Sequence, residues 1–511
     1  MSSQRQGSAF SELDRLDLDS FAGRPVAVLG LARSGVALCR FLVDRGAVVT
    51  AYDIRRSGAL ADQLAQLEGR PLRLLLGPDV DPRDALAGQA LICTSPSISS
   101  RYPTTEPRLR SALRDVEVAR RVPIVSEIDL FLRLSPAVAV GVTGTKGKTT
   151  TASLAAAVLG AGDAPVLLGG NTGAPLIERL PELTEGHRVV LELSELQLPT
   201  LHRGTAVAVF TNVTLDHLDR HGSVEAYRAV KRRLAELTPA DGRLVLNADD
   251  AVSAGFAAVS SAAAVYYGRT DPPSGSVGIR DGWLVGERVE RLPGVVDGWS
   301  TAGPVGPVGR IMPVDDIRLP GAHNVSNVLA AVTVGLLFGI AADRLRQAIR
   351  SFKGLEHRLE TVLRLDGVLF VNDTKATQVD AVIAALHSFE PPIVLIAGGG
   401  GKDLPLDGLA REVAARASAA VLIGETGPEM ARLFRAAGAR NVEQADDMQQ
   451  AVSRAFRLAR DELATTSARE ATILLSPAAS GVETFTNRSV RGDEFKDAVR
   501  KLAALVAVGR A

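Results

Sequence analysis

Residues 137–159 read AVAVGVTGTKGKTTTASLAAAVL, and this stretch decides the fold. It begins with a short apolar run, passes through a turn rich in glycine and threonine, and continues into a segment rich in alanine and leucine. A short apolar run that ends at glycine is typical of a buried strand, and the alanine-rich segment is typical of a helix. The stretch therefore predicts a strand, a phosphate-binding loop and a helix.

The loop itself has a residue type for each task in holding ATP. Glycines let backbone N–H groups turn towards phosphate oxygens, and the start of the helix adds positive potential. Lys148 would neutralise phosphate charge, and Thr149 or Thr150 would bind Mg²⁺. A generic phosphate loop has a glycine where Val142 stands, so the strand-loop-helix context carries the prediction. The predicted ATP-binding residues here are Gly144, Thr145, Lys146, Gly147, Lys148, Thr149 and Thr150.

The alternation of strand and helix recurs on both sides of the loop. Strand-like runs precede it at residues 25–29 and 47–53, and follow it at 189–193, 206–213 and 243–248. GVLFVND (367–373) opens a third such series, whereas residues 268–312 are rich in glycine and proline and indicate peripheral turns and short strands. We therefore predict an α/β protein of three domains with parallel sheets: Rossmann-like over 1–136, phosphate-loop over 137–357, and Rossmann-like over 358–511.

Bulk composition excludes several classes of protein. Lysine plus arginine equals aspartate plus glutamate at 58 each, so no global positive field would gather nucleic acid or an anionic membrane. Cys39 and Cys93 form no CxxC pair, which indicates two buried apolar residues and no disulfide or zinc site. No stretch approaches the roughly 18 apolar residues of a membrane helix. We expect a cytoplasmic monomer that binds neither nucleic acid nor membrane.

Three further motifs follow the loop in order. Residues 169–173 read GGNTG, residues 192–194 read ELS, and residues 212–222 read NVTLDHLDRHG. With the loop, they resemble segments of the Mur ligases and of their relatives, the folylpolyglutamate synthetases. An ordered set of motifs is far more specific than any one of them. The resemblance implies an ATP-dependent ligase that forms an amide bond.

The residues around the loop also predict a metal centre. Glu192 ends an apolar strand beside the loop, where a carboxylate would hold a second Mg²⁺, and His217 could supply a neutral imidazole. Lys231 matches the family lysine whose ε-amine is carbamylated and becomes a metal ligand, although its pattern alone indicates a solvated helix lysine. The predicted ligands of two Mg²⁺ ions are Thr149, Glu192, His217 and Lys231. The predicted catalytic residues are Lys148, Glu192, His217 and Lys231.

Downstream motifs extend the resemblance to the rest of ATP. PGAHNVSN (320–327) and EHR (356–358) resemble segments that contact adenine and phosphate, which implicates Asn324, Asn327 and Arg358. NDTKAT (372–377) matches the glutamate-adding members, in which the aspartate, here Asp373, holds the ATP ribose. Since these contacts lie far along the chain from residues 144–149, we expect the third domain to close over the second.

The resemblance assigns the incoming glutamate to the third domain. Lys375, Thr377 and Lys402 together would clamp its carboxylates. The closing segment reads SPAASGVETFTNRSVRG (476–492), with Gly481 and Arg488 where D-glutamate-adding enzymes offer a serine and an aromatic. Ser480 could replace that hydroxyl, and Arg488 could pair with a carboxylate of glutamate.

The first domain would bind a nucleotide-linked substrate. GLARSG (30–35) is a degraded dinucleotide motif with Ala32 at the middle glycine, so a nicotinamide site is not expected. In the family this turn cradles the UDP diphosphate, and the ends of the second and fourth strands grip uracil and diphosphate. Asn171 and Ser194 are predicted to reach the same substrate. The predicted residues of the first domain are Gly30, Ser34, Gly35, Asp53, Arg55 and Ser95.

The resemblance is strongest to the glutamate-adding members. It implies ligation of D-glutamate to UDP-N-acetylmuramoyl-L-alanine through an acyl phosphate, in peptidoglycan precursor synthesis. Two alternatives stay open: the same reaction with L-glutamate, and a non-catalytic nucleotide-binding member. Lys146 and Glu195 replace residues of the family segments GTNGKTT and ELSSFQL and, with Gly481 and Arg488, motivate these alternatives. A folylpolyglutamate synthetase is disfavoured by the UDP-type first domain and by NDTKAT.

Overall fold

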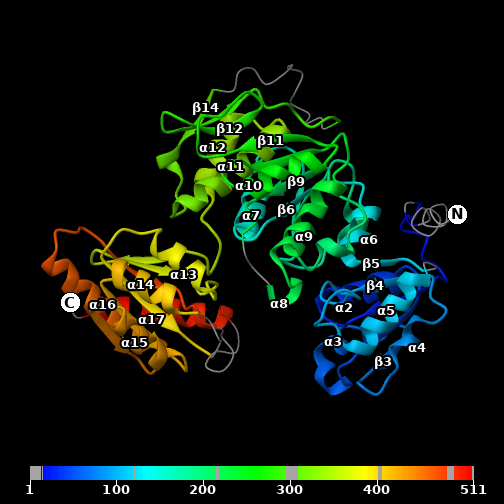
Figure 1. Ribbon diagram of the computed structural model, residues 1–511, viewed down its shortest axis with the longest axis horizontal. Helices are drawn as coiled ribbons and strands as arrows, with labels where there is room; N and C mark the ends of the chain where they lie inside the picture. Colours follow the sequence, from blue (N-terminus) through cyan, green and yellow to red (C-terminus); the bar gives the residue numbers. More distant parts are fainter. Residues whose placement is uncertain are drawn as a thin grey trace. The chain divides into compact units, whose positions relative to one another are not determined.

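The computed structural model describes residues 13, 15–119, 122–214, 218–294, 309–400, 405–479 and 488–508. They fall into two compact units (Figure 1): unit 1 comprises Met1–Asp316 and Ser326–Ser351, and unit 2 comprises Ile317–Val325 and Phe352–Ala511. Unit 1 contains a five-stranded and a nine-stranded sheet, and unit 2 contains a six-stranded sheet. Helices pack against the strands in both units, which confirms the predicted α/β class.

The five-stranded sheet is parallel throughout, in the order β3-β2-β1-β4-β5. Alternate residues of β1 join two cores: Val26 and Val28 pack in the core of α2, whereas Ala27 and Leu29 pack in that of α5. Such sheets bind ligands where the strand order reverses, which here is between β1 and β4. The elements are β1 (Pro25–Leu29), α2 (Arg33–Asp44), β2 (Val48–Asp53), α3 (Ala61–Ala65), β3 (Leu72–Leu76), α4 (Pro82–Leu86), β4 (Leu91–Thr94), α5 (Pro107–Ala119), β5 (Ile124–Ser126) and α6 (Glu127–Leu134).

The nine-stranded sheet has the order β14-β13-β12-β11-β10-β9-β6-β8-β7. Strands β7 to β11 run parallel with β6, whereas β13 pairs antiparallel with both β12 and β14. The segment rich in glycine and proline thus extends one end of the sheet. The strands are β6 (Val138–Thr143), β7 (Val166–Gly170), β8 (Arg188–Glu192), β9 (Val207–Phe210), β10 (Arg243–Asn247), β11 (Ala263–Tyr267), β12 (Ser276–Arg280), β13 (Trp283–Glu287) and β14 (Arg310–Pro313).

Helices of this second part of unit 1 follow the strands in the expected alternation. The α-helices are α7 (Lys148–Leu159), α8 (Leu218–His221), α9 (Val224–Leu237), α10 (Ala251–Ala254), α11 (Ala322–Leu337) and α12 (Ala342–Ser351). Among the described residues, the short 3₁₀ helices are η1 (Ser57–Leu60), which belongs to the five-stranded sheet, and η2 (Ile177–Glu182), η3 (Leu198–Thr200), η4 (Gly255–Val259) and η5 (Val314–Asp316) of this second part. The division between the units falls within α11, which starts in unit 2 and ends in unit 1.

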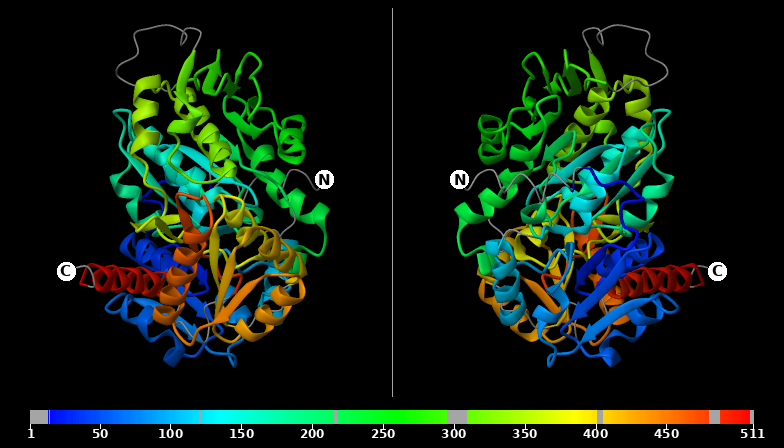
Figure 2. Two further views of the ribbon diagram at one scale, coloured as in Figure 1. Left: turned by 90° about the vertical axis from the view of Figure 1, so that its left-hand side faces the viewer. Right: turned by 90° about the vertical axis from the view of Figure 1, so that its right-hand side faces the viewer.

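The sheet of unit 2 has the order β15-β16-β20-β17-β18-β19, and its one departure from parallel pairing among the described strands is β15. Figure 2 shows α17, in red, reaching outward at the C-terminal end, where Leu505 and Val508 are exposed. The elements are β15 (Glu360–Leu365), β16 (Val368–Asn372), α13 (Val379–Leu386), β17 (Ile393–Gly398), α14 (Asp407–Arg416), β18 (Ala419–Ile423), α15 (Gly427–Ala436), β19 (Asn441–Gln444), α16 (Met448–Thr465), β20 (Ala471–Leu475) and α17 (Arg488–Val508).

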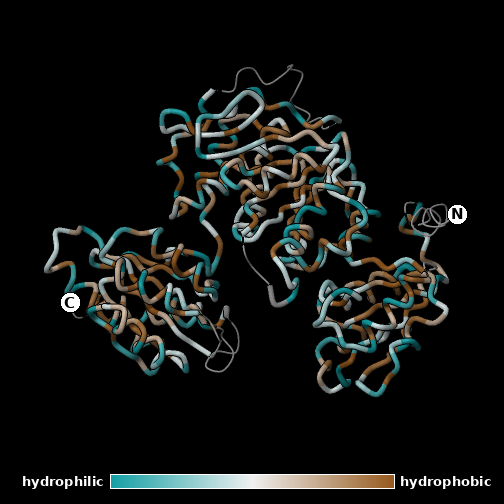
Figure 3. Tube along the Cα trace, in the orientation of Figure 1, coloured by the Kyte–Doolittle hydropathy of each residue, from teal (hydrophilic) through white to brown (hydrophobic). Residues whose placement is uncertain are grey.

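The hydrophobic cores follow the division into units. One cluster in unit 1 joins the inner faces of β1, β2 and α2 to those of β8, β9 and α9, so both sheets of unit 1 share it. Unit 2 has its own two clusters, one on each face of its sheet. In Figure 3 the central strands of each unit are brown, as their apolar side chains require. Within the described residues, no helix is long and apolar enough to cross a membrane.

Candidate active site

The phosphate loop lies between β6 and α7, as predicted. Gly144 and Gly147 both adopt positive φ angles, of 146° and 82°. A Cβ at Gly144 would overlap Thr211 Oγ1, and one at Gly147 would crowd Asn327 Oδ1, so both positions require glycine. Beyond Gly147 the helix presents backbone N–H groups that lack helical partners, which is the arrangement that binds phosphate.

The end of β9 holds this loop in place. The Thr145 amide donates to the Asn212 carbonyl at 2.8 Å, and the Lys146 amide donates to Asn212 Oδ1 at 3.0 Å. Lys148 Nζ donates to the Thr145 carbonyl at 2.9 Å, and Thr149 and Thr150 follow in the first turn of α7. On the other side, Asn327 Oδ1 accepts a hydrogen bond from Thr151 Oγ1 at 3.1 Å, which ties α11 to α7.

Two of the predicted metal ligands lie at the carboxyl edge of the same sheet. Glu192 ends β8 beside β6 and is 2% exposed. Its Oε1 accepts a hydrogen bond from Asn171 Nδ2 at 3.2 Å, and its Oε2 is buried with no hydrogen-bond partner among the described residues. Lys231 on α9 is 0% exposed, and its Nζ donates to Thr143 Oγ1 at 3.3 Å.

The Glu192 carboxylate fits a hard divalent cation, whereas Lys231 would fit one only as the negatively charged carbamate. A buried carboxylate oxygen without a donor is costly unless a cation or a ligand meets it, and carboxylate and hydroxyl oxygens are the ligands that Mg²⁺ prefers. Thr149, in the first turn of α7, would add a hydroxyl. The predicted ligand His217 lies outside the described residues.

The predicted residues of the five-stranded sheet meet at its carboxyl edge, after β1, β2 and β4. Gly30 has φ 87°, and its carbonyl accepts a hydrogen bond from Ser95 Oγ at 3.0 Å. A Cβ at Gly35 would overlap the Gly30 carbonyl, so the first turn of α2, which also carries Ser34, can approach β1 only with glycine there. The start of α2 and small side chains therefore lie at this edge, an arrangement that suits a diphosphate.

Asp53 and Arg55 form a pair at the end of β2. Arg55 Nε and Nη2 donate to the two Asp53 carboxylate oxygens at 3.0 and 2.7 Å, and the Leu31 amide donates to Asp53 Oδ2 at 2.8 Å. Burial alone would raise the pKa of Asp53, but these hydrogen bonds hold it below its usual value. Asp53 is thus an ionised acceptor that orients the turn after β1.

Asn171 and Ser194 lie in the nine-stranded sheet, at the ends of β7 and β8. The Asn171 amide donates to the Glu192 carbonyl at 2.8 Å, while the Ser194 amide and hydroxyl donate to Gln197 Oε1 at 2.9 and 3.0 Å. Arg33 Nη1 of α2 donates to the Gly173 carbonyl at 2.9 Å, which joins the GGNTG turn to the first sheet. The two sheets therefore bring their predicted substrate residues towards one another within unit 1.

In unit 2, Asp373 lies where β16 and β20 end side by side. The Leu359 amide donates to its Oδ1 at 3.2 Å, and Ser476 Oγ donates to its Oδ2 at 3.1 Å. Burial raises the pKa of Asp373 to about 7. Asn324, also in unit 2, donates from Nδ2 to the Pro320 carbonyl at 2.7 Å and is 6% exposed.

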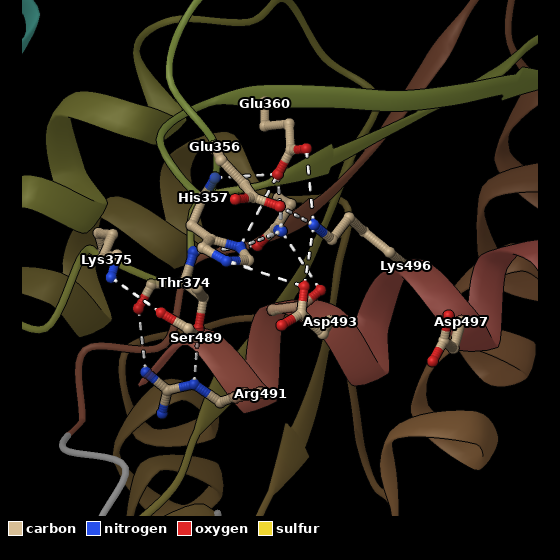
Figure 4. Close-up of polar contacts among 12 residues, drawn as sticks. Glu356, His357, Glu360, Thr374, Lys375, Ser489, Arg491, Asp493, Lys496 and Asp497 are labelled. Atoms are coloured by element: carbon tan, nitrogen blue, oxygen red, sulfur yellow. Dashed lines mark hydrogen bonds and ion pairs between the residues drawn. The ribbon is translucent and has the colours of Figure 1, made fainter. Parts of the chain in front are cut away.

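Arg358 reaches the same edge because β15 runs antiparallel, so the start of β15 lies beside the end of β16. Figure 4 shows how α17 holds the EHR segment: Lys496 Nζ lies 2.5 Å from Glu356 Oε1 and 2.9 Å from Asp493 Oδ1. The carboxylates around His357 thus already have a cation, which makes them an ion-pair network and not a metal site.

Two of the predicted glutamate ligands follow Asp373 in the same loop. Lys375 Nζ donates to Ser489 Oγ at 3.2 Å (Figure 4), and the Thr377 amide donates to the Lys375 carbonyl at 3.0 Å. Lys402 and Ser480 lie outside the described residues, as does the side chain of Arg488. Their predicted roles stay predictions.

Two structural residues carry little sequence signal. Arg491 is 0% exposed and donates from Nε to Thr374 Oγ1 at 2.9 Å and from Nη2 to the Thr374 carbonyl at 3.1 Å (Figure 4). It therefore fixes the loop that carries Asp373 and Lys375. Tyr102, in the loop after β4, is 3% exposed and contacts the segment after β8. Arg491 lies at the end of the closing segment SPAASGVETFTNRSVRG, whereas Tyr102 lies in none of the motifs.

Comparison with known families agrees with this geometry. Residues 142–335 match the Mur ligase middle domain. Residues 357–478 match the Mur ligase glutamate ligase domain. The two matches include the phosphate loop, Glu192 and Lys231 in the first case, and Arg358, Asp373, Lys375 and Thr377 in the second.

Similar proteins extend the match to nearly the whole chain. The UDP-N-acetylmuramoylalanine–D-glutamate ligase of Symbiobacterium thermophilum is 38% identical over 481 residues, which are 93% of this chain and 98% of that protein. The protein of the same name from Roseiflexus sp. is 36% identical over 493 residues, again 93% of this chain and 98% of the relative.

Solved structures show the same fold at low identity. A pseudomurein peptide ligase from Methanothermus fervidus has a TM-score of 0.52 at 18% identity, covering 94% of this chain and 100% of that one. The UDP-N-acetylmuramate-alanine ligase of Thermotoga maritima has a TM-score of 0.53 at 16% identity, covering 93% of this chain and 99% of that one.

Proposed function

This chain belongs to the Mur ligase family, and we propose that it uses ATP to join D-glutamate to UDP-N-acetylmuramoyl-L-alanine in peptidoglycan precursor synthesis. The observation that carries the proposal is the 38% identity, over 93% of the chain, to a ligase named for this reaction. The geometry of the phosphate loop and of Glu192 supports it, because both are needed for phosphoryl transfer. The substrates and ATP would meet the enzyme in the cytoplasm.

The reaction has two bond-forming steps. An alanine carboxylate oxygen attacks the γ-phosphorus of ATP, the bond from that phosphorus to the bridging oxygen breaks, and ADP leaves. The glutamate amine then attacks the acyl carbon, loses a proton, and displaces phosphate to leave the amide. No protein nucleophile is required, so positioning and charge stabilisation supply the acceleration.

Unit 1 would bind the reacting phosphates. Amides of residues 144–150 and the Lys148 ammonium would hold the β- and γ-phosphate oxygens. Thr149, Glu192, His217 and carbamylated Lys231 would hold Mg²⁺, which when bound offsets charge on the transferred phosphoryl group. Carbamylation joins CO₂ to the Lys231 amine with release of a proton, and ¹³CO₂ labelling followed by NMR would detect it without any activity assay.

The remaining predicted residues divide by substrate. Gly30, Ser34, Gly35 and the Asp53–Arg55 pair would hold the UDP part, with Ser95, Asn171 and Ser194. Adenosine and phosphate would be held by Asn324, Asn327, Arg358 and Asp373. The glutamate would be held by Lys375, Thr377, Lys402, Ser480 and Arg488. The proposed domains for these tasks are residues 1–136, 137–357 and 358–511.

The test is release of phosphate from ATP and Mg²⁺ with UDP-N-acetylmuramoyl-L-alanine, in parallel tubes with D-glutamate, L-glutamate or no amino acid. Lys148→Ala serves as the inactive control, because it removes the ammonium group that would neutralise phosphate charge, together with its hydrogen bond to the Thr145 carbonyl. The amide product is identified by mass spectrometry.

The expected result is turnover with D-glutamate alone. Turnover with L-glutamate alone would mean that the stereochemistry differs from the proposal. No turnover in any tube, with ATP still bound, would favour the non-catalytic alternative.

A further inference from the structure

The loop between β4 and α5 carries a buried side chain, Tyr102, that contacts the segment after β8 in the nine-stranded sheet. Tyr102 extends from this loop, and its hydroxyl lies 3.3 Å from both the Glu195 and the Leu196 carbonyl oxygens. Burial raises the pKa of the Tyr102 hydroxyl, so it remains a donor shared between the two carbonyls. Both carbonyls belong to the segment that follows Glu192, so Tyr102 contacts the backbone next to the proposed metal ligand.

The Tyr102 ring is also connected to the phosphate loop by aromatic contacts through His221 and Tyr227. The rings of Tyr102 and His221 meet edge to face with centroids 6.4 Å apart, and those of His221 and Tyr227 lie 5.5 Å apart. The Tyr227 hydroxyl is 3.1 Å from Thr145 Oγ1 in the phosphate loop. Lys231 Nζ lies 5.5 Å from the centroid of the Tyr227 ring. Tyr227 therefore contacts both the loop and the buried lysine.

A charged contact runs beside these rings. Arg220 Nη1 donates to Glu195 Oε1 at 3.2 Å, and the Glu195 side chain is 8% exposed. Glu195 and Arg220 thus hold α8 against the same backbone that Tyr102 contacts. The carboxylate that departs from the family segment ELSSFQL is therefore paired with an arginine.

On its other side, the Tyr102 loop is anchored at the proposed UDP site. Ser95 Oγ donates to the Gly30 carbonyl at 3.0 Å, and the Ile98 amide donates to the Ser95 carbonyl at 2.9 Å. The Ser99 amide donates to Thr105 Oγ1 at 3.0 Å, and the Thr105 amide to the Tyr102 carbonyl at 3.1 Å. These hydrogen bonds link Ser95 to the loop that carries Tyr102. A ligand that binds at Gly30 or Ser95 and shifts them would therefore shift Tyr102 as well.

We propose that Tyr102 is a positioning residue that couples binding of the UDP-linked substrate to the phosphate loop, so that this substrate tightens the binding of ATP. The inference rests on the proposed function, since it needs both ligands. Coupling of this kind is reciprocal, so ATP tightens the UDP-linked substrate by the same factor.

The test measures that factor directly, without turnover. Full-length protein is titrated with a non-hydrolysable ATP analogue and Mg²⁺ by calorimetry, with and without saturating UDP-N-acetylmuramoyl-L-alanine, and the ratio of the two Kd values is the coupling factor. The variants are Tyr102→Phe, which removes only the shared hydroxyl, and Tyr102→Leu, which also removes the ring edge that meets His221.

Tyr267→Phe is the matched control. Tyr267 is 1% exposed, and its hydroxyl is likewise shared between two carbonyls, those of Phe210 at 2.9 Å and Thr211 at 3.3 Å, but these lie at the end of β9 and not in the segment that follows β8. We expect a coupling factor of about five or more in the wild type, a smaller one in Tyr102→Phe and about one in Tyr102→Leu. Tyr267→Phe should lower Tm and keep the wild-type factor, which separates coupling from general loss of stability.

Either of two results would overturn the inference: a wild-type factor of one, or an unchanged factor in Tyr102→Leu. If Tyr102→Leu does not fold, an unchanged factor in Tyr102→Phe overturns it instead. Wild-type protein that binds both ligands without coupling contradicts this inference alone, whereas wild-type protein that binds neither contradicts the proposed function too.

Discussion

Among the residues of the proposed metal site, Glu192 has the most unusual surroundings. Its carboxylate is nearly inaccessible, one oxygen bonds to Asn171, and the other has no donor among the described residues. A charge held in this way destabilises the fold unless a cation meets it. We therefore expect Glu192 to lower the stability of the metal-free fold if it serves as the proposed metal ligand.

Replacing Glu192 by glutamine separates these two effects. In Glu192→Gln we expect the Mg²⁺ concentration for half-maximal activity to rise and kcat to fall by about 100-fold, while Tm without ligands stays level or rises. The measurements are a Mg²⁺ titration of phosphate release and thermal unfolding. Glu182→Gln is the control, because Glu182 is exposed and paired with Arg179; equal effects of the two substitutions would exclude a metal role for Glu192.

The raised pKa of Asp373 predicts that the stability of the fold depends on pH. Burial raises its pKa to about 7, so the folded chain favours the protonated form. As pH rises from about 4, the unfolded chain ionises first, and this residue's contribution to stability falls until about pH 7 and then levels off. The free energy of unfolding of the wild type should therefore fall over this window relative to that of Asp373→Asn. Parallel curves for the two proteins would show that the pKa of Asp373 is not raised.

The burial of Lys231 could have been predicted from the sequence pattern of its helix. Its position alone indicates a solvated helix lysine, yet the structure buries it completely. The buried residues of α9 are Tyr227, Lys231, Leu234 and Ala235, which recur at the spacing of one helix face. The apolar stripe of α9 therefore contains Lys231 and could have revealed its burial. Tyr102 has no such signal, because the loop that positions it has no period.

At the scale of elements, α17 supports the site in unit 2. Its first turns carry Lys496, which binds the segment before β15, and Arg491, which binds the loop after β16 (Figure 4). Its last turns carry the exposed apolar residues Leu505 and Val508. Strand runs such as GVLFVND were predictable, because buried strands are continuously apolar. The antiparallel course of β15 was not, since strand direction follows from the length and path of connections that residue patterns do not encode.

Arg491 should matter far more to stability than another arginine of the same helix. Arg491→Ala removes a buried guanidinium and leaves the Thr374 and Ala479 carbonyls without their donor. We expect a loss of about 2–4 kcal/mol in the free energy of unfolding, measured in urea. Arg500→Ala is the control, because Arg500 is exposed and pairs only at the surface with Asp497, so its loss should be below about 1 kcal/mol. Equal losses would contradict a bracing role for Arg491.

At the scale of the whole molecule, the cores divide the chain differently from the sheets. The sequence predicts three domains from three series of strands, and three sheets are present among the described residues. However, the two sheets of unit 1 share a hydrophobic cluster, whereas unit 2 has clusters of its own. Residue patterns reveal which runs are buried, but they do not reveal which buried runs pack together.

The shared core predicts two unfolding transitions in calorimetry and not three. Because β1 and β8 contribute to one cluster, both sheets of unit 1 should unfold together. UDP-N-acetylmuramoyl-L-alanine should raise the midpoint of that transition and leave the transition of unit 2 in place. A third transition, or a shift of both midpoints by this ligand alone, would show that the cooperative units differ from the two described.

The order of strands in the nine-stranded sheet also has a practical use. The loop after β6, Glu192 and Asn212 lie at one side of the sheet, whereas the antiparallel strands β13 and β14 form the opposite end, with β10, β11 and β12 in between. We expect a fluorophore or an affinity handle joined at Asp281, which is exposed in the turn between β12 and β13, to leave the rate of phosphate release unchanged. The enzyme could thus be immobilised on a biosensor surface or followed in a living cell through this one attachment point.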